Sequence, residues 1–256
     1  MTLKFTILGC GSSMGVPTAT NNWGNCNPNE KKNIRTRCSA LITSKNSNTL
    51  IDTSPDLRLQ LLNNKIQNIK RVIYTHMHAD QTHGINDLRA FFLKNNKRIN
   101  IYADTLTSKY LKKTFKYCFN DGKEYPAIAK INILKKNMKF KSNENLSIKS
   151  IPVPHGKIMC MSFIFNNKLA YASDLHDIYT NDLKYFKKLK FLVIDCLRYS
   201  NHPAHLNFDA CMKLIKYLKP NKAILTNLHA DIDYHYIKQY IPKNVVPAYD
   251  GMSFLI

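Results

Sequence analysis

The chain alternates short β-branched or aromatic runs with segments whose apolar residues recur at helical spacing. Strands are expected at 4–8, 39–43, 49–51, 72–75, 99–103, 146–153, 161–165, 168–172, 191–194 and 223–226, with one more at the C-terminus. Helices are expected at 56–62, 84–93, 107–119, 183–188, 208–218 and 234–240, whereas 120–145 is loosely patterned and expected to be peripheral. Two strand-rich halves with helices between the strands predict an α+β fold, in which two mixed sheets pack face to face with helices outside.

Length and composition bound the class of protein. The 256 residues are 44% hydrophobic and show no low-complexity linker or internal repeat, so we expect a single domain over 1–256. No apolar run approaches the ~20 residues of a membrane span, and the first residues read as a strand and not a signal peptide. Seven cysteines without a Cys-x-x-Cys pair fit reduced, buried thiols. These features predict a cytoplasmic protein without a membrane partner.

The formal charge of +21 raises the question of nucleic-acid binding. Of the 38 basic residues, 31 are Lys, and they are scattered from end to end. Evenly spread lysines are more typical of a solvated surface than of a binding stripe. Nucleic acid is therefore an open partner but not a favoured one, while the basic surface would attract small anionic substrates.

Candidate metal chemistry is concentrated in the stretch 71–83, Arg-Val-Ile-Tyr-Thr-His-Met-His-Ala-Asp-Gln-Thr-His. A buried strand leads directly into His76, His78 and Asp80. In extended backbone the two histidines project to one side and can reach one ion, while Asp80 swings in behind them. Two imidazoles and a carboxylate suit a divalent ion such as zinc or manganese.

Further His and Asp residues follow other predicted strands. His155 comes after Ile151-Pro152-Val153-Pro154, Asp174 after Ala172-Ser173, and His229 after Asn227-Leu228. Strand ends deliver side chains to one edge of a sandwich with little slack. The sequence therefore predicts that these residues converge on one cleft.

This ordered series of motifs resembles that of the metallo-β-lactamase superfamily over nearly the whole chain. The opening Leu-Gly-Cys-Gly-Ser-Ser-Met-Gly-Val-Pro, the core Thr-His-x-His-Ala-Asp and the late His-Pro-Ala-His are similar to its PhnP-like branch, which is related to ribonuclease Z. The resemblance implies an αββα four-layer sandwich. It also implies a metal-dependent hydrolase, a phosphodiesterase that cleaves a phosphodiester or cyclic ribose phosphate with a metal-bound hydroxide.

The same resemblance implies roles for individual residues. His76, His78 and His155 would hold the first of two divalent ions, Zn or Mn. Asp80 and His229 would hold the second, and Asp174 would bridge the two. Asp52, behind them, would orient a ligand. Asp80 and Asp174 therefore belong to the catalytic set as well.

Two departures from the pattern change the expectations. Position 81, where the superfamily usually has His, is Gln81, a weaker ligand through its amide oxygen, so the second site is expected to bind loosely. His83 is a less favoured substitute from the next turn. In the loop 23–26 only Cys26 is present where PhnP-like relatives often carry several cysteines, so we predict no structural zinc.

In the branch that the chain resembles, a histidine in the late segment 198–206 serves as general acid, and His205 matches it best. Imidazole suits this role because it titrates near the working pH. His176 is the other candidate for the proton donor. Alternatively, His205 is a loop histidine that only caps or hydrogen-bonds locally. His235 is given no role. Arg198 and Arg89 could bind phosphate, although a salt bridge within the fold, such as Arg89 with Asp87, is at least as well supported.

Two other functions stay open at this stage. One is a ribonuclease Z-like nuclease, although no Gly-rich arm is visible among the eight glycines. The other is a metal- or nucleic-acid-binding module whose turnover is weak or lost because of Gln81. A homodimer is a further open expectation.

Overall fold

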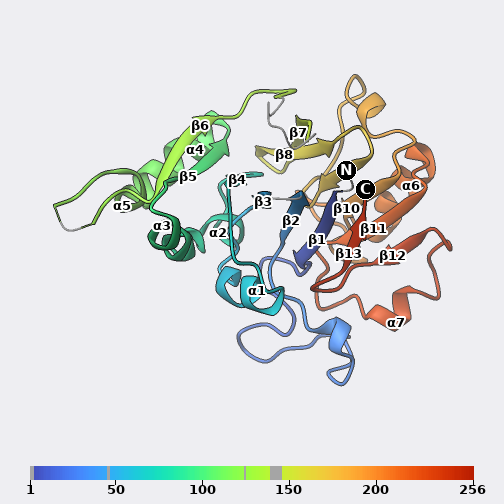
Figure 1. Ribbon diagram of the computed structural model, residues 1–256. Helices are drawn as coiled ribbons and strands as arrows, with labels where there is room; N and C mark the ends of the chain where they lie inside the picture. The colour runs from blue at the N-terminus through green and yellow to red at the C-terminus, as the bar shows by residue number, and fades with distance from the viewer. Residues whose placement is uncertain (1–2, 45–46, 124, 139–145) are drawn as a thin grey trace.

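The computed structural model describes residues 3–44, 47–123, 125–138 and 146–256. Two β-sheets form its centre. The first holds seven strands in the order β13-β1-β2-β3-β4-β5-β6, and the second holds six in the order β12-β11-β10-β9-β8-β7. In Figure 1 the first and last strands of the chain's first sheet, β1 and β13, lie next to each other.

The strands of the first sheet are β1 (Lys4–Gly9), β2 (Ser39–Ser44), β3 (Ser47–Ile51), β4 (Arg71–Ile73), β5 (Ile99–Ala103), β6 (Ala129–Ile133) and β13 (Ser253–Leu255). Those of the second are β7 (Ile148–His155), β8 (Ile158–Phe165), β9 (Leu169–Ala172), β10 (Phe191–Asp195), β11 (Lys222–Thr226) and β12 (Val245–Pro247). Each sheet mixes antiparallel and parallel pairs. Parallel strands need crossovers, and the helices supply them.

The helices are α1 (Leu57–Asn63), α2 (Ala79–Thr82), α3 (Arg89–Asn95), α4 (Thr105–Thr114), α5 (Lys116–Phe119), α6 (Phe208–Leu218) and α7 (Tyr234–Ile237). Short 3-10 turns lie at Lys31–Asn33, Ile85–Leu88 and Leu183–Tyr185. Among the described residues, no helix has the length and apolar character that crossing a membrane requires.

Three apolar clusters define the layers. The central one joins side chains of both sheets, such as Phe5 and Ile42 of the first with Phe163 and Tyr171 of the second. A second cluster packs the first sheet against α1, α3 and α4. A third packs the second sheet against α6 and α7. The order helix, sheet, sheet, helix is the αββα sandwich predicted from the sequence, and the fold class is confirmed.

Several predicted elements differ in extent. The helix expected at 107–119 begins earlier, because Asp104 caps the amide N–H groups of Leu106 and Thr107, and it breaks at Phe115. The helices expected at 84–93 and 183–188 are partly or wholly 3-10 turns, and the last helix stops at Ile237.

The segment 120–145, expected to be peripheral, contains a strand that was not predicted. Residues 124 and 139–145 lie outside the described residues, but 129–133 form β6, which pairs in parallel with β5. Its sequence, Ala-Lys-Ile-Asn-Ile, is half exposed at the sheet edge, so its apolar signal is weak.

The topology places the functional segments at one edge. Strands β3 and β4 are parallel, and so are β9, β10 and β11. Strand β7 runs in the same direction as β9, because each is antiparallel to β8. Within each sheet the carboxyl ends of these strands therefore lie at one edge, and the predicted site residues follow them.

Candidate metal centre

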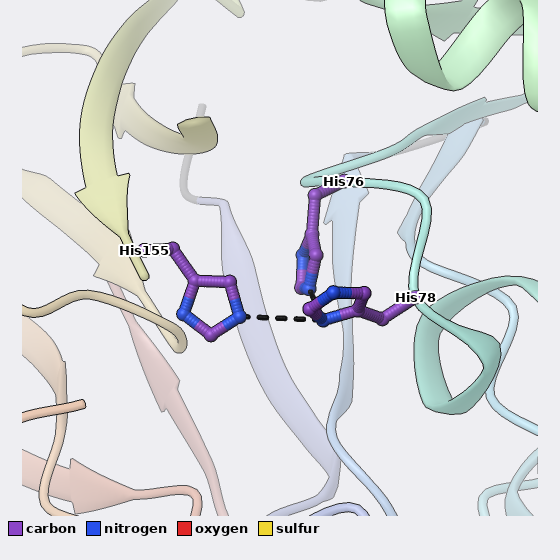
Figure 2. A group of neighbouring side chains, drawn as sticks. All are labelled: His76, His78 and His155. Carbon is purple, nitrogen blue, oxygen red and sulfur yellow. Dashed lines mark hydrogen bonds between the residues drawn. The ribbon is translucent and has the colours of Figure 1, made fainter. Parts of the chain in front are cut away.

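Three histidines meet between the two sheets. His76 and His78 come from the loop after β4, and His155 is the last residue of β7. The Nε2 atom of His76 lies 2.8 Å from Nδ1 of His78, which lies 3.3 Å from Nε2 of His155. Figure 2 shows the three rings turned toward a common point, as ligands of one ion would be.

Hydrogen bonds set the tautomers of two of these rings. The Thr75 hydroxyl donates to Asp52 Oδ2 at 2.9 Å, so its oxygen accepts the Nδ1–H of His76 at 3.0 Å. On the other side, the Ala204 carbonyl accepts the Nδ1–H of His155 at 3.0 Å. Both arrangements leave the lone pair on Nε2, the atom that faces the shared point.

Charge also favours metal binding at this point. Burial lowers the pKa of His76 to about 3, and burial likewise lowers the pKa of His155. Both imidazoles are therefore neutral near pH 7, the form in which histidine binds metal. The donor set, three imidazole nitrogens held by neighbouring groups, fits a divalent ion.

Asp52 reaches this cluster through Thr75 and not directly. Its buried carboxylate accepts the Thr75 amide N–H at 2.7 Å as well as the hydroxyl. Asp52 has a positive φ of 61°, which turns the chain sharply at the end of β3. Asp52 is thus joined to His76 through Thr75, and its role in orienting a metal ligand stays a prediction.

The carboxylates of the predicted second site lie in the adjoining cleft. This cleft, of about 350 Å³, is lined by residues from both halves of the chain: Ser12, Ser13, Met14, His78, Asp80, His155, Asp174, Leu197, Arg198, His202, Ala204, His205, Asn227 and His229. Burial, followed by the nearby charge of Asp174, raises the pKa of Asp80 to about 6. Two carboxylates that repel each other in a partly buried cleft are suited to a bound cation.

Asp174 follows β9 and is buried. Burial acts to raise its pKa, but the neighbouring rings of His76, His205 and His155, together with the Ser173 hydroxyl, outweigh burial and lower the pKa below its usual range. Its Oδ2 accepts the Ser173 hydroxyl at 2.6 Å, and its Oδ1 accepts the Asn227 amide at 3.4 Å. The carboxylate is thus held ionised in the wall of the cleft.

Gln81 and His229 differ in their exposure to the cleft. His229 lines it, with Nδ1 3.2 Å from Asp231 Oδ1. Gln81 is fully buried and does not line it, and its Nε2 donates to Asp80 Oδ2 at 3.0 Å. Its Oε1 has no hydrogen-bond partner among the described residues. An orphaned acceptor beside Asp80 fits the expected weak ligand, and that role stays a prediction.

His205 lies beside His155 in the wall of the cleft, with the two ring centroids 4.6 Å apart. Its Nδ1 contacts the buried Oδ2 of Asp195 at 2.6 Å. Burial acts to lower the pKa of His205, but the Asp195 carboxylate outweighs it and raises the pKa to about 9. His205 is therefore protonated near neutral pH, and its other ring nitrogen is left for a ligand in the cleft.

Several alternatives from the sequence are placed elsewhere. His83 is exposed and its Nε2 lies 3.0 Å from the Tyr110 hydroxyl, so it is wrong as a substitute ligand. His176 does not line the cleft but a neighbouring cavity, and His235 contacts Glu30. Arg89 lies 4.7 Å from the Tyr125 ring, away from the cleft, because α3 covers the outer face of the sheet.

Sequence reasoning missed the residues that support the site. Asp195 ends β10 and Asn227 follows β11, and the Asn227 amide donates to both Asp174 and Asp195, the latter at 3.3 Å. The strand-end rule that located Asp174 could have located both. The hydroxyl of Thr75 and the carbonyl of Ala204 carry no such signal, because their roles depend on geometry alone.

Known proteins share this fold. A family model described as "Beta-lactamase superfamily domain" matches residues 47–227, well over half of the chain. The chain therefore belongs to the beta-lactamase superfamily, a class of metal-dependent hydrolases whose members bind divalent metals. The superfamily predicted from the sequence is confirmed.

Similarity extends over the whole chain in individual structures. A structure described as a new diphosphatase from the PhnP family is 27% identical, with a TM-score of 0.90, over 100% of this chain and 98% of that one. The short form of human tRNase Z has a TM-score of 0.69 at 15% identity, over 98% of each chain, and it supports the fold alone.

One curated relative is longer. The octanoyltransferase of Porphyromonas gingivalis is 27% identical over 260 residues, which cover 99% of this chain and 52% of that protein. The chain thus spans about half the length of this curated relative.

Proposed function

We propose that the chain is a metal-dependent phosphodiesterase that cleaves a small phosphodiester or a cyclic ribose phosphate. The observation that carries the proposal is the histidine cluster at the cleft, where the neutral imidazoles of His76 and His155 meet His78 and the protonated ring of His205 lies beside His155. The similarity to a PhnP-family diphosphatase supports chemistry at phosphorus. The octanoyl transfer named for the longer relative is not carried over, since this chain matches only about half of it.

The residues present would hold two ions. His76, His78 and His155 would bind the first, with Asp80, Gln81 and His229 at the second and Asp174 between them. Ions bound there would lower the pKa of a water molecule and neutralise phosphoryl oxygens.

The protein groups around the cleft supply the remaining chemistry. His205, held through Nδ1 by Asp195, would give a proton from its other ring nitrogen to the departing alkoxide. Arg198 lines the same cleft, and its Nη2 donates to the Asn201 carbonyl at 2.8 Å. Its remaining N–H groups suit a phosphate oxygen.

The test is metal content together with hydrolysis of bis(p-nitrophenyl) phosphate after reconstitution with Zn or Mn. We expect hydrolysis that depends on metal and is abolished in His78→Ala, with His176→Ala as the matched control outside the cleft. Stoichiometric metal without hydrolysis would favour the binding-module alternative. Cleavage of a precursor tRNA but of no small diester would favour the nuclease alternative.

A further inference from the structure

A second cavity lies beside the cleft and has no part in the mechanism above. It measures about 670 Å³ and is lined by loop 24–27, Tyr199, Asp231, Asp233 and Tyr236. We call it the tyrosine pocket. Its size falls within the range of ligand sites for small molecules.

The tyrosine pocket is joined to the cleft through two short pieces of chain. Arg198 lines the cleft and its neighbour Tyr199 lines the pocket. Likewise, His229 lines the cleft and the Asp231 carboxylate, 3.2 Å from the His229 ring, lines the pocket. The two cavities are therefore neighbours in the fold.

The wall of the pocket is preformed. Gly24 has a positive φ of 54°, and a Cβ there would approach the Ala230 carbonyl oxygen to 2.7 Å, so only glycine fits. The Cys26 thiol lies 3.3 Å from the carbonyls of both Ala230 and Ile232. Asp233 is occupied by capping α7. The loop 24–27 is thus fixed against the segment that carries His229.

The lining indicates what kind of group the pocket takes. None of the eight described residues that line it is basic, in a chain of net charge +21, so it is not suited to a second phosphate. Tyr199 and Tyr236 contribute aromatic rings to the lining, and the Tyr199 hydroxyl has no hydrogen-bond partner among the described residues. The Asp231 carboxylate offers an acceptor. Flat rings that carry N–H donors match this combination.

From these features we infer that the tyrosine pocket binds the nucleobase of a nucleoside phosphate ester whose phosphate lies in the cleft. This inference rests on the proposed function and narrows its substrate class. Stacking on Tyr236 and a hydrogen bond to Tyr199 or Asp231 would strengthen binding without touching the reacting atoms.

Two substrates with the same leaving group test the inference: the p-nitrophenyl ester of AMP and p-nitrophenyl methyl phosphate. We expect a higher kcat/KM for the AMP ester. Tyr236→Ala should lower that value by roughly tenfold, as loss of a stacking partner does, and leave the methyl ester within about twofold. Tyr199→Phe, which keeps the ring, should cost less. Tyr217→Ala, an exposed tyrosine on α6, is the control and should change neither.

Binding of AMP by equilibrium dialysis separates the two proposals, because it needs no turnover. AMP bound by the wild type and the Tyr217→Ala protein but weakly by Tyr236→Ala supports the pocket even if no ester is hydrolysed. Equal kcat/KM for the two esters together with AMP binding unaffected by Tyr236→Ala would overturn the inference. Hydrolysis of the methyl ester would still support the phosphodiesterase.

Discussion

At the scale of single residues, the hydroxyl of Thr75 decides which nitrogen of His76 can bind metal. It donates to Asp52 and accepts from His76 Nδ1, so the lone pair stays on Nε2. Loss of such an outer partner typically lowers metal affinity by about 10–100-fold. We therefore expect Thr75→Val to weaken zinc binding by roughly this factor, measured by competition with a chromogenic chelator.

Thr75→Ser is the matched control, because it keeps the hydroxyl. It should bind zinc as the wild type does. If Thr75→Val and the wild type bind zinc equally while both stay folded by circular dichroism, the proposed role of the hydroxyl is wrong.

His205 makes a different contribution, because it faces the cleft without being one of the expected ligands. We expect His205→Ala to keep its metal and to slow hydrolysis of a diester with a poor alkoxide leaving group by roughly 10²–10⁴-fold. A p-nitrophenyl diester should slow much less, since p-nitrophenolate departs without a proton. Rates that fall equally for both substrates, with metal retained, would contradict the donor role.

Asp195 should set the pH above which His205 loses its proton and can no longer act as the donor. The carboxylate raises the pKa of His205 to about 9, so the ring is protonated, and able to donate, below this pH. In Asp195→Asn the pKa moves down toward the ordinary value, and the alkaline limb of kcat for the poor leaving group should move to lower pH. The pH–rate profile measures this shift. If the alkaline limb of the variant stays at the wild-type pH, Asp195 does not control the pKa of the proton donor.

At the scale of elements, the short helix α2 brings Asp80 and Gln81 to the site. The backbone carbonyl of Gln81 accepts the Thr53 amide N–H at 2.7 Å, which ties α2 to the turn after β3. This fixed position makes Gln81→His a conservative graft of the usual superfamily ligand. We expect the variant to bind a second equivalent of metal more tightly and to be more active at limiting metal.

Metal content after dialysis against a graded chelator is the measurement. The wild type should lose its second equivalent before its first, and Gln81→His should lose both together. Two equivalents held equally tightly by the wild type would show that Gln81 does not weaken the site.

The helices and strands also show which elements can be predicted from the sequence. The alternating and helical patterns identified most central strands and α6, because these bury one face or both. Edge strand β6 was not predicted, because its exposed positions weaken the alternation of apolar and polar residues. The turn of helix at 79–82 was not predicted, since four residues show no helical period, and β4 ends at Ile73 and not at the expected Thr75.

The residues of the candidate site were predictable where they directly follow or end a predicted strand. His155, Asp174 and His229 were assigned to the cleft by this rule, and the structure places them in its lining. The exclusion of His83 was not predictable, because it depends on the direction in which α2 turns the side chain toward Tyr110. The contact between His205 and Asp195 was not predictable either, because the two residues are ten positions apart and meet only in the fold.

At the scale of the whole molecule, the expected metal ligands come from both sheets. His76 and His78 follow β4 of the first sheet, while His155, Asp174 and His229 follow strands of the second. An ion held between them would link the two halves at the cleft edge. Such a ligand set exists only in the folded chain, so metal binding should stabilise the native state.

The size of this stabilisation can be stated in advance. Free zinc at 100 times its dissociation constant adds about 2.7 kcal/mol to the free energy of unfolding. For a chain of this length that corresponds to a rise in Tm of roughly 5–11 °C. We expect the zinc-loaded protein to unfold at a temperature higher by this amount than the chelated protein, measured by differential scanning calorimetry. His155→Ala, which loses a ligand from the second sheet but keeps those from the first, should lose most of the increase. An equal rise in that variant would mean that zinc stabilises the chain from somewhere other than the junction of the two sheets.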